Sequence, residues 1–435
     1  MKKLDKVILL SIPLLSISAE ITKSFFENSD VMVVRTILCM VLVSILFLKY
    51  LPQIVSFNKS LILLMGYLLL ILFVQKAPLQ SFQSWMLFTE SKMLLPLAFV
   101  LLSDKIALSG MSKVLFWIGV LFAVSILYFL TMNVGVNQYG GTDGFTVGAF
   151  KFNRLYTGSF ILLSLPLIFR NSKNQFIRRI VPVLSLLVLV ILILSTRRTA
   201  IITTITGGLV FAIYYFRKLP NILLGLTAFM LVLASAFPLY KDILLKQIEK
   251  RQHVFVEQKG FDLQSETRFE ETIAVWKERI QNPDPIIIFF GQQLFNSAGN
   301  YDQGIHGTRP LHLDINVMLH GSGLIGLILF ILFYTELVIT FFRYRSTWSD
   351  GEGRLTEATA AAIILPLIML TFSGGMLAIT HQMIAAMVTG ACLGNLASGS
   401  YGRRTLFEKP KPAIFSQQNF EVLNEKVKPK ALVYE

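Results

Sequence analysis

Residues 180–216 read IVPVLSLLVLVILILSTRRTAIITTITGGLVFAIYYF, in which two apolar runs flank the adjacent arginines Arg197 and Arg198. Each run approaches the roughly 20 residues that an α-helix needs to cross a hydrocarbon core about 30 Å thick. In lipid, a single segment satisfies its own backbone hydrogen bonds only as a helix. The stretch therefore predicts two membrane-spanning helices joined by a short polar turn.

The same pattern recurs along the whole chain. About ten further apolar runs surround this pair, which predicts an all-α, polytopic integral membrane protein with about 12 transmembrane helices. The predicted spans cover residues 7–25, 31–48, 60–75, 85–103, 114–132, 155–169, 180–195, 199–216, 221–238, 312–342, 359–377 and 378–398.

Composition agrees with a membrane protein. Apolar side chains make up 54% of the 435 residues and charged ones only 15%, whereas soluble domains carry about 25% charged residues. This excludes an ordinary soluble enzyme. Lys and Arg outnumber Asp and Glu by 40 to 26, but they flank the apolar runs, so they indicate membrane topology and no nucleic-acid partner. Cys39 and Cys392 lie inside apolar runs and predict no disulfide framework or cysteine metal site.

Basic residues in the short loops predict the orientation. With the N-terminus inside, the cytoplasmic loops hold about twice as many lysines and arginines as the short outer loops. Both termini are therefore predicted to be cytoplasmic. The segment Met1–Ala19 resembles a secretory signal, but Ile17 breaks the small-residue cleavage pattern, so we expect an uncleaved first span.

This topology divides the chain into four parts. Residues 1–238 are predicted to form an N-terminal transmembrane bundle of about nine spans, with a glycine-rich outer loop over 133–154. Residues 239–311 form one long outer, periplasmic loop, residues 312–398 form the C-terminal transmembrane helices, and residues 399–435 form a disordered cytoplasmic tail. Because long polar loops on membrane proteins usually carry function, we expect the functional site beside 239–311.

The long loop contains the signals of short helices. Thr267 and Glu270 have the spacing of a capping box, which predicts a helix that begins there and ends at Asn282-Pro283. One face of this helix is apolar and is suited to lying on the membrane or on the spans below. Its members are Phe269, Ile273, Trp276 and Ile280. The run from Pro285 to Gly291 predicts a short buried extended segment closed by a glycine turn.

Three arginines on the predicted outer face are candidates for binding an anion. Arg197 and Arg198 lie at the headgroup boundary, where guanidinium groups either anchor to phospholipid or meet an anionic substrate. Arg268 lies in the first turn of the capped helix, where free amides and the macrodipole already attract anions. The alternative for Arg268 is an ordinary salt bridge with its glutamate neighbours.

His312 lies where the long loop re-enters the membrane. A histidine at this boundary is either a hydrogen-bonded structural residue or a proton acceptor for a reaction at the outer face. Asn316 would share its helix face, whereas Asp314 would point to the other side. The other histidines form no ligand pair, so we expect no metal and no cofactor.

These residues, taken in order, resemble the O-antigen ligase and polymerase family, the Wzy-type membrane glycosyltransferases. The stretch from His312 to Gly323 and Gly326 resembles the histidine motif of the family, with Leu313 at a position where the family usually has asparagine. Arg197-Arg198 resembles its arginine segment. The long-loop motif is matched by Glu266, Arg268, Trp276, Pro285 and Gly291.

The resemblance implies a GT-C-like membrane enzyme in the bacterial inner membrane, with its active face periplasmic. The donor would be a glycan linked through pyrophosphate to undecaprenyl lipid. The acceptor would be a second glycan for a polymerase, which we favour, or lipid A core for a ligase. A chain-length regulator is a possible partner. The implied mechanism is a metal-independent, inverting transfer.

In that mechanism Arg197 or Arg198, together with Arg268, binds the pyrophosphate, and His312 takes the proton of the acceptor hydroxyl. The competing class is a polysaccharide transporter or flippase. Transporters place broken helices and ionisable groups near the bilayer midplane, whereas the polar residues of this chain gather at one face. The sequence therefore favours the enzyme.

Overall fold

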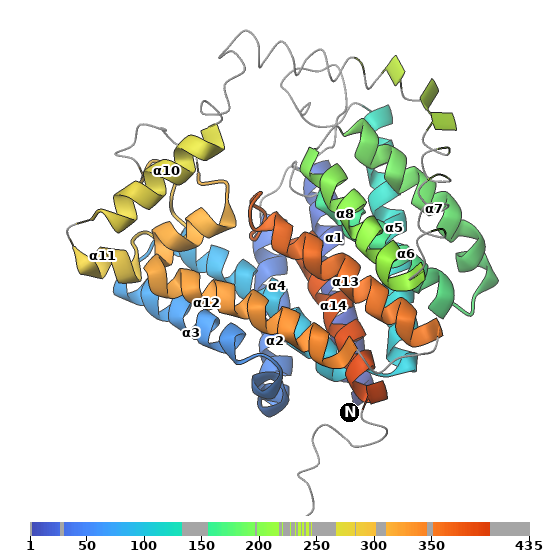
Figure 1. The fold of residues 1–435 in the computed structure, drawn as a ribbon, viewed down its shortest axis with the longest axis horizontal. Coiled ribbons are helices and arrows are strands. Elements are labelled where there is room, and N and C mark those ends of the chain that lie inside the picture. Colours follow the sequence, from blue (N-terminus) through green and yellow to red (C-terminus); the bar gives the residue numbers. More distant parts are fainter. Residues whose placement is uncertain are drawn as a thin grey trace, which may run out of the picture.

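The computed structural model describes residues 2–26, 30–132, 155–195, 198–216, 267–282, 284–301, 310–345 and 351–400, with isolated positions between 220 and 245. All regular structure in these ranges is helical, which confirms the all-α prediction (Figure 1). The helices are α1 (Lys2–Phe26), α2 (Asp30–Phe57), α3 (Lys59–Val74), α4 (Leu79–Leu101), α5 (Lys105–Thr131), α6 (Tyr156–Asn171), α7 (Gln175–Leu194), α8 (Arg198–Phe216), α10 (Thr267–Ile280), α11 (Pro285–Phe290), α12 (Asp314–Arg345), α13 (Gly351–Leu370) and α14 (Ile379–Ser400).

Seven of these helices are long and apolar enough to cross a membrane, namely α2, α4, α5, α7, α8, α12 and α13. A protein that spans the membrane several times is thereby supported. Helices also form at the predicted spans that correspond to α1, α3, α6 and α14. The predicted span at 221–238 lies outside the described residues apart from isolated positions. The count of 12 spans and the GT-C-like assignment therefore stay predictions.

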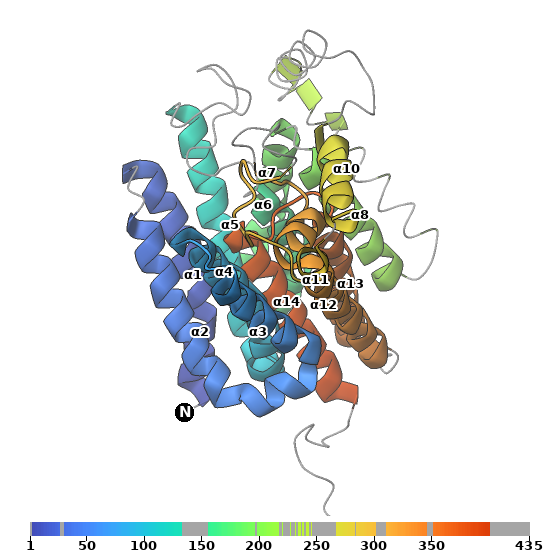
Figure 2. The ribbon, with the colours of Figure 1, turned by 90° about the vertical axis from the view of Figure 1, so that its left-hand side faces the viewer.

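Helix α14 is the centre of the bundle and packs against α4, α13, α6 and α1. Its small residues allow this close approach, because helices in membranes associate largely through tight packing of Gly and Ala surfaces. Ala385, Ala386 and Ala391 are almost fully buried. In the two views of the ribbon, α14 lies among the other helices of the bundle (Figure 1 and Figure 2).

The long-loop helices α10 and α11 pack on the first half of α12, at one end of the bundle (Figure 2). The end of α3 holds them in place through the Gln75 side chain. Its Nε2 donates to the Gly321 carbonyl at 2.9 Å, and its Oε1 accepts from the Leu294 amide at 2.9 Å. Gln75 therefore links the end of α3 both to α12 and to the segment that follows α11.

Helix α10 begins at Thr267, as the capping box predicts, and ends before Asn282. The extended segment predicted for 285–291 is wrong: these residues form the six-residue helix α11, and none of its side chains is buried. The reason is local, because the Asp284 carboxylate caps the Ile286 amide at 2.8 Å and Pro285 occupies the first helical position.

Helix α12 contains a break at Gly323, where φ is 64° and ψ is −165°. A side chain at this position would collide with the backbone of Phe289 at the end of α11. The break and the docking of α11 therefore depend on the same glycine, because the left-handed region disfavours every residue with a Cβ.

We expect Gly323→Ala to lower the free energy of unfolding by about 2 kcal/mol, from left-handed strain and steric overlap. The measurement is an SDS titration of the protein in mixed micelles. Gly66→Ala is the matched control, because an added Cβ at Gly66 of α3 meets nothing within 4 Å. A Gly323 variant as stable as the Gly66 variant would contradict this account of the break.

Candidate functional site

His312 lies beside Glu271, a carboxylate that α10 brings from the long loop. The imidazole Nδ1 is 3.2 Å from Glu271 Oε1, and the His312 backbone amide donates to Oε2 at 3.4 Å. The His312 side chain is 35% exposed, whereas Glu271 is fully buried. The imidazole Nδ1 and the buried carboxylate therefore lie at ion-pair distance, without the geometry of a hydrogen bond between these two atoms.

The same faces of α10 and α12 make two further polar contacts. Asn316 Nδ2 donates to Thr272 Oγ1 at 2.9 Å, and Arg279 Nη2 donates to His320 Nδ1 at 2.6 Å. Asn316 and His320 are four residues apart on α12 and present one face to α10. His312 lies before Asp314, the first residue of α12, and contacts α10 from outside that helix.

Arg279, which contacts His320, is fully buried. The sequence does not identify it as a candidate. Besides His320, the Gln292 side-chain carbonyl in its better-satisfied orientation accepts from Nη1 at 3.1 Å and from Nη2 at 3.0 Å. Burial lowers the pKa of Arg279 from its ordinary value, and the Glu278 carboxylate at 3.5 Å acts in the opposite direction. Arg279 therefore joins α10, α12 and the segment after α11.

The connection between α13 and α14 supports His312 from the other side. Asp314 Oδ1 accepts from the backbone amides of Gly375 at 2.9 Å and Met376 at 3.2 Å. A side chain on Gly374, where φ is 78°, would collide with the His312 carbonyl oxygen. Asp314 is the first residue of α12, and its carboxylate binds this connection, which packs against the His312 backbone.

The described coordinates place only part of the predicted arginine cluster. Arg197 lies outside the described residues, and Arg198 begins α8 but its side chain is not described. Arg268 lies in the first turn of α10, and its side chain is likewise outside the described part. The pyrophosphate contacts predicted for the three arginines therefore stay predictions.

Contacts between neighbouring helices nevertheless place the start of α8 at the same end of the bundle as His312. Ser159 of α6 donates to the Ala200 carbonyl of α8 at 3.1 Å. Tyr156, one turn earlier on α6, lies 3.0 Å through its hydroxyl from Ser373 Oγ in the α13–α14 connection. That connection is the one that packs on His312, so both candidate groups belong to one end.

Ionisable side chains also lie inside the bundle. Arg35 of α2 is 3.3 Å from Glu90 of α4, with side chains 3% and 0% exposed. Lys92, also buried, donates to Gln382 Oε1 at 2.7 Å and to the Tyr334 hydroxyl at 3.2 Å. The signal in the sequence was a single charge within an apolar run, which does not identify its partner.

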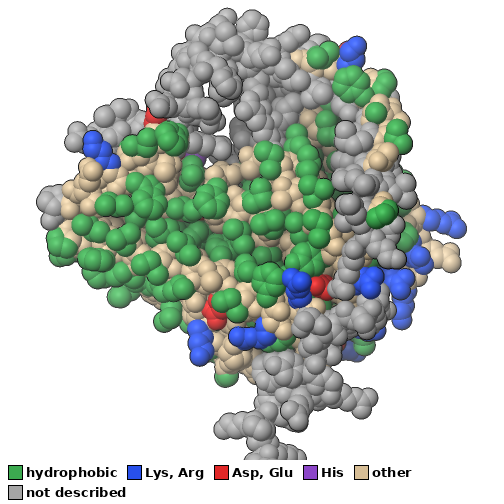
Figure 3. Space-filling model, viewed as in Figure 1, with side chains coloured by type: hydrophobic (Ala, Val, Ile, Leu, Met, Phe, Trp, Pro, Cys, Tyr) green, Lys and Arg blue, Asp and Glu red, His purple; other side chains and the backbone are tan. Residues whose placement is uncertain are grey.

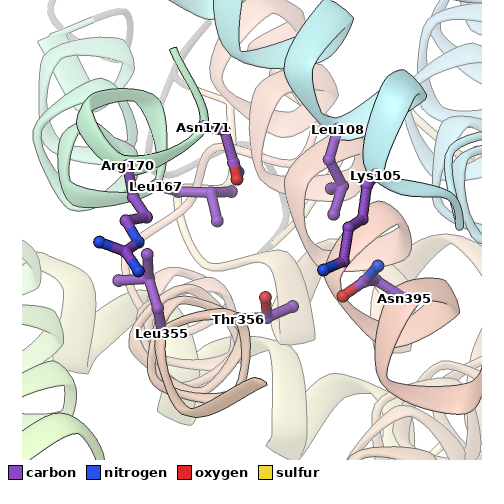
Figure 4. Close-up of a pocket in the computed structure, with 8 residues that line it drawn as sticks. All are labelled: Lys105, Leu108, Leu167, Arg170, Asn171, Leu355, Thr356 and Asn395. Carbon is purple, nitrogen blue, oxygen red and sulfur yellow. The ribbon is translucent and has the colours of Figure 1, made fainter. Parts of the chain in front are cut away.

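A small pocket lies at the opposite end of α13 from His312 (Figure 4). Lys105 and Arg170 lie on opposite sides of it in the close-up, with Thr356 between them. Leu355 belongs to the first turns of α13, whereas the connection beside His312 follows its last turn. The pocket is therefore separate from the His312 site.

Among the described residues, no group of three or more His, Cys, Asp or Glu side chains is arranged to hold a metal ion. The arrangement at His312 offers a proton acceptor and a buried carboxylate that orients it, at the junction of a long-loop helix and a membrane-spanning helix. Comparisons of the chain with models of known protein families and with curated proteins gave no match.

Proposed function

We propose that this protein is a membrane glycosyltransferase that polymerises oligosaccharide repeat units carried on undecaprenyl pyrophosphate. The observation that carries the proposal is the contact between His312 and the buried Glu271, 3.2 Å apart. It supplies a general base with an orienting carboxylate, the arrangement that activates a hydroxyl nucleophile.

The proposed step is a direct displacement at the anomeric carbon. The acceptor hydroxyl oxygen forms the new bond, the bond from that carbon to the pyrophosphate oxygen breaks, and the hydroxyl proton moves to His312. Because Nδ1 faces Glu271, the ring nitrogen Nε2 is the one that accepts the proton. Glu271 then stabilises the imidazolium, and the configuration of the anomeric carbon is inverted.

The leaving group needs positive charge around its two phosphates. Arg268 comes from the same helix as Glu271, three residues earlier, and α8 begins with Arg198 at the same end of the bundle. In the proposal these arginines and Arg197 bind the pyrophosphate, because guanidinium forks match phosphate oxygens and replace a divalent metal. The free energy of the reaction comes from the pyrophosphate bond of the donor.

The test is transfer by the purified protein in lipid nanodiscs, with an undecaprenyl-pyrophosphate-linked oligosaccharide as donor and acceptor. We expect longer lipid-linked products with inverted anomeric configuration, at a rate that EDTA does not lower. Absence of any new glycosidic bond, or retention of configuration, would overturn the proposal. In cells, a deletion strain whose lipid A core carries one repeat supports a polymerase, and long glycan left on the carrier supports a ligase.

A transporter of the same lipid-linked sugars is the second candidate. It is favoured by the buried Arg35–Glu90 pair and by buried Lys92, because ionisable groups inside membrane bundles often mark transport pathways. Movement of labelled lipid-linked sugar between leaflets by the purified protein, with no new glycosidic bond, would select this candidate.

A further inference from the structure

Helix α10 has two faces with different partners. Glu271, Val275 and Arg279 are fully buried, and the two charged members of this set contact α12. The apolar face predicted from the sequence is instead exposed. The exposed fractions are 53% for Phe269, 52% for Ile273, 37% for Trp276 and 50% for Ile280. Helix α10 therefore packs on the bundle through the face that carries Glu271 and Arg279, and its apolar face points outward.

Helix α11 continues this outward apolar surface. Ile286 is 66% exposed, Phe289 48% and Phe290 41%. The position of α11 is fixed at the end of α3, because Gln75 Nε2 donates to the Phe290 carbonyl at 3.3 Å. Helix α11, which carries these three side chains, therefore lies beside the C-terminal end of α3.

The apolar surface of α10 and α11 is continuous with the outer surface of α3 and α12. Leu70, Phe73 and Val74 at the end of α3 are 60 to 67% exposed, and α12, a candidate membrane span, exposes Ile328 and Ile331. The space-filling view shows many hydrophobic side chains on this face, interspersed with other atoms (Figure 3). Exposed apolar side chains on a candidate membrane span are suited to facing lipid.

We propose that α10 and α11 lie in the interface of the lipid bilayer, with the seven exposed apolar side chains of the two helices inserted among the lipids. The occupant of this surface is lipid and not a second protein, because α10 and α11 pack directly on α12, a candidate membrane span that exposes apolar side chains of its own. Charged residues lie beside the apolar face of α10, as in helices that lie along a membrane. They are Lys277 and Glu278.

This arrangement gives the bilayer a direct effect on the candidate site. Helix α10 would rest on lipid through Phe269 and Ile273. The same helix carries Glu271 on its buried face, and Glu271 contacts His312. Lipid below and α12 beside the helix then fix its rotation, so that the carboxylate stays on the imidazole. The lipid contact itself does not depend on the proposed reaction and is tested without it.

The first experiment uses Trp276 as its probe. A protein in which Trp85, Trp117 and Trp348 are replaced by Phe is placed in phosphatidylcholine and phosphatidylglycerol nanodiscs, with or without lipids brominated near the top of the acyl chain. We expect brominated lipid to reduce the Trp276 emission at least twofold and aqueous iodide to have little effect. The control moves the probe to the polar face of the same helix, by Trp276→Phe with Lys277→Trp, and there iodide is expected to quench.

Strong quenching of Trp276 by iodide with none by brominated lipid would overturn the proposal. A second measurement leaves the tryptophans unchanged. Ile280→Cys and Lys277→Cys are compared for reaction with a water-soluble maleimide in the same nanodiscs, since Cys39 and Cys392 are buried. We expect Ile280→Cys to react at least tenfold more slowly than Lys277→Cys. Equal rates for the two variants would likewise overturn the lipid contact.

Discussion

Replacement of His312 by alanine is expected to lower the rate of glycosidic bond formation by about two to four orders of magnitude, the usual contribution of a general base. The imidazole is partly exposed and lies 3.2 Å from a buried carboxylate, so in the proposal it is the group that takes the acceptor proton. His312→Gln keeps a polar side chain but has no ring nitrogen to accept a proton, so it should lose activity to a similar extent. The measurement is the initial rate of transfer with purified protein in nanodiscs.

Glu271→Gln separates the role of the carboxylate from that of the ring. The amide keeps the size of the side chain and loses the charge that stabilises an imidazolium, so we expect a loss on the order of 10²-fold, below that of His312→Ala. Lys277→Ala, an exposed change on the same helix, is the control and should retain activity. Full activity in His312→Ala, with wild-type stability, would remove the histidine from the mechanism.

Much of the helical arrangement was predictable because it depends on properties local to the sequence. Runs of apolar residues give the positions of α2, α7 and α8 directly. The capping box gives the start of α10, since a cap is a contact between residues three apart. The prediction of an extended segment at 285–291 was wrong because a short apolar run fits a strand or a helix equally well. The Asp284 cap and Pro285 at the first helical position select the helix.

The sequence predicts His312 as a site residue but not the residues that contact α12 and His312 from α10. The position of His312 at the membrane boundary identifies it from the sequence, whereas Glu271 reads only as a salt-bridge neighbour of Arg268, and nothing in the sequence singles out Arg279. Periodicity shows which residues share a face on one helix, such as Asn316 and His320 of α12. It does not show which helix docks on that face, because the docking depends on contacts 41 residues apart in the sequence.

The same limit applies inside the bundle. Glu90 is visible in the sequence as an acidic residue at membrane depth, and Arg35 as a charge in an apolar run, yet only the fold brings them within 3.3 Å. Arg35 also donates to Ser16 at 2.7 Å, and Ser16 lies 2.9 Å from Thr380. Three helices, α1, α2 and α4, therefore meet at one guanidinium, and α14 joins them through the contact of Thr380 with Ser16.

We expect Arg35→Met and Glu90→Met, made singly, each to lower the free energy of unfolding by about 3–5 kcal/mol, because each leaves an unpaired charge inside the bundle. The double variant should recover most of this loss, since two apolar side chains of similar length fill the same space without a desolvation cost. Ser16 and Thr380 keep each other as partners in all three proteins. The measurement is an SDS titration of the four proteins in mixed micelles.

The activity of the double variant then distinguishes the two candidate functions. If the pair is structural, the stable double variant should polymerise at a rate close to wild type, because the His312 and Glu271 contact involves α10 and α12 and neither Arg35 nor Glu90. If the pair belongs to a transport pathway, the same stable protein should lose its function, because the ionisable groups would be what the substrate or a coupling ion meets. A double variant as unstable as the single ones would contradict the ion-pair account itself.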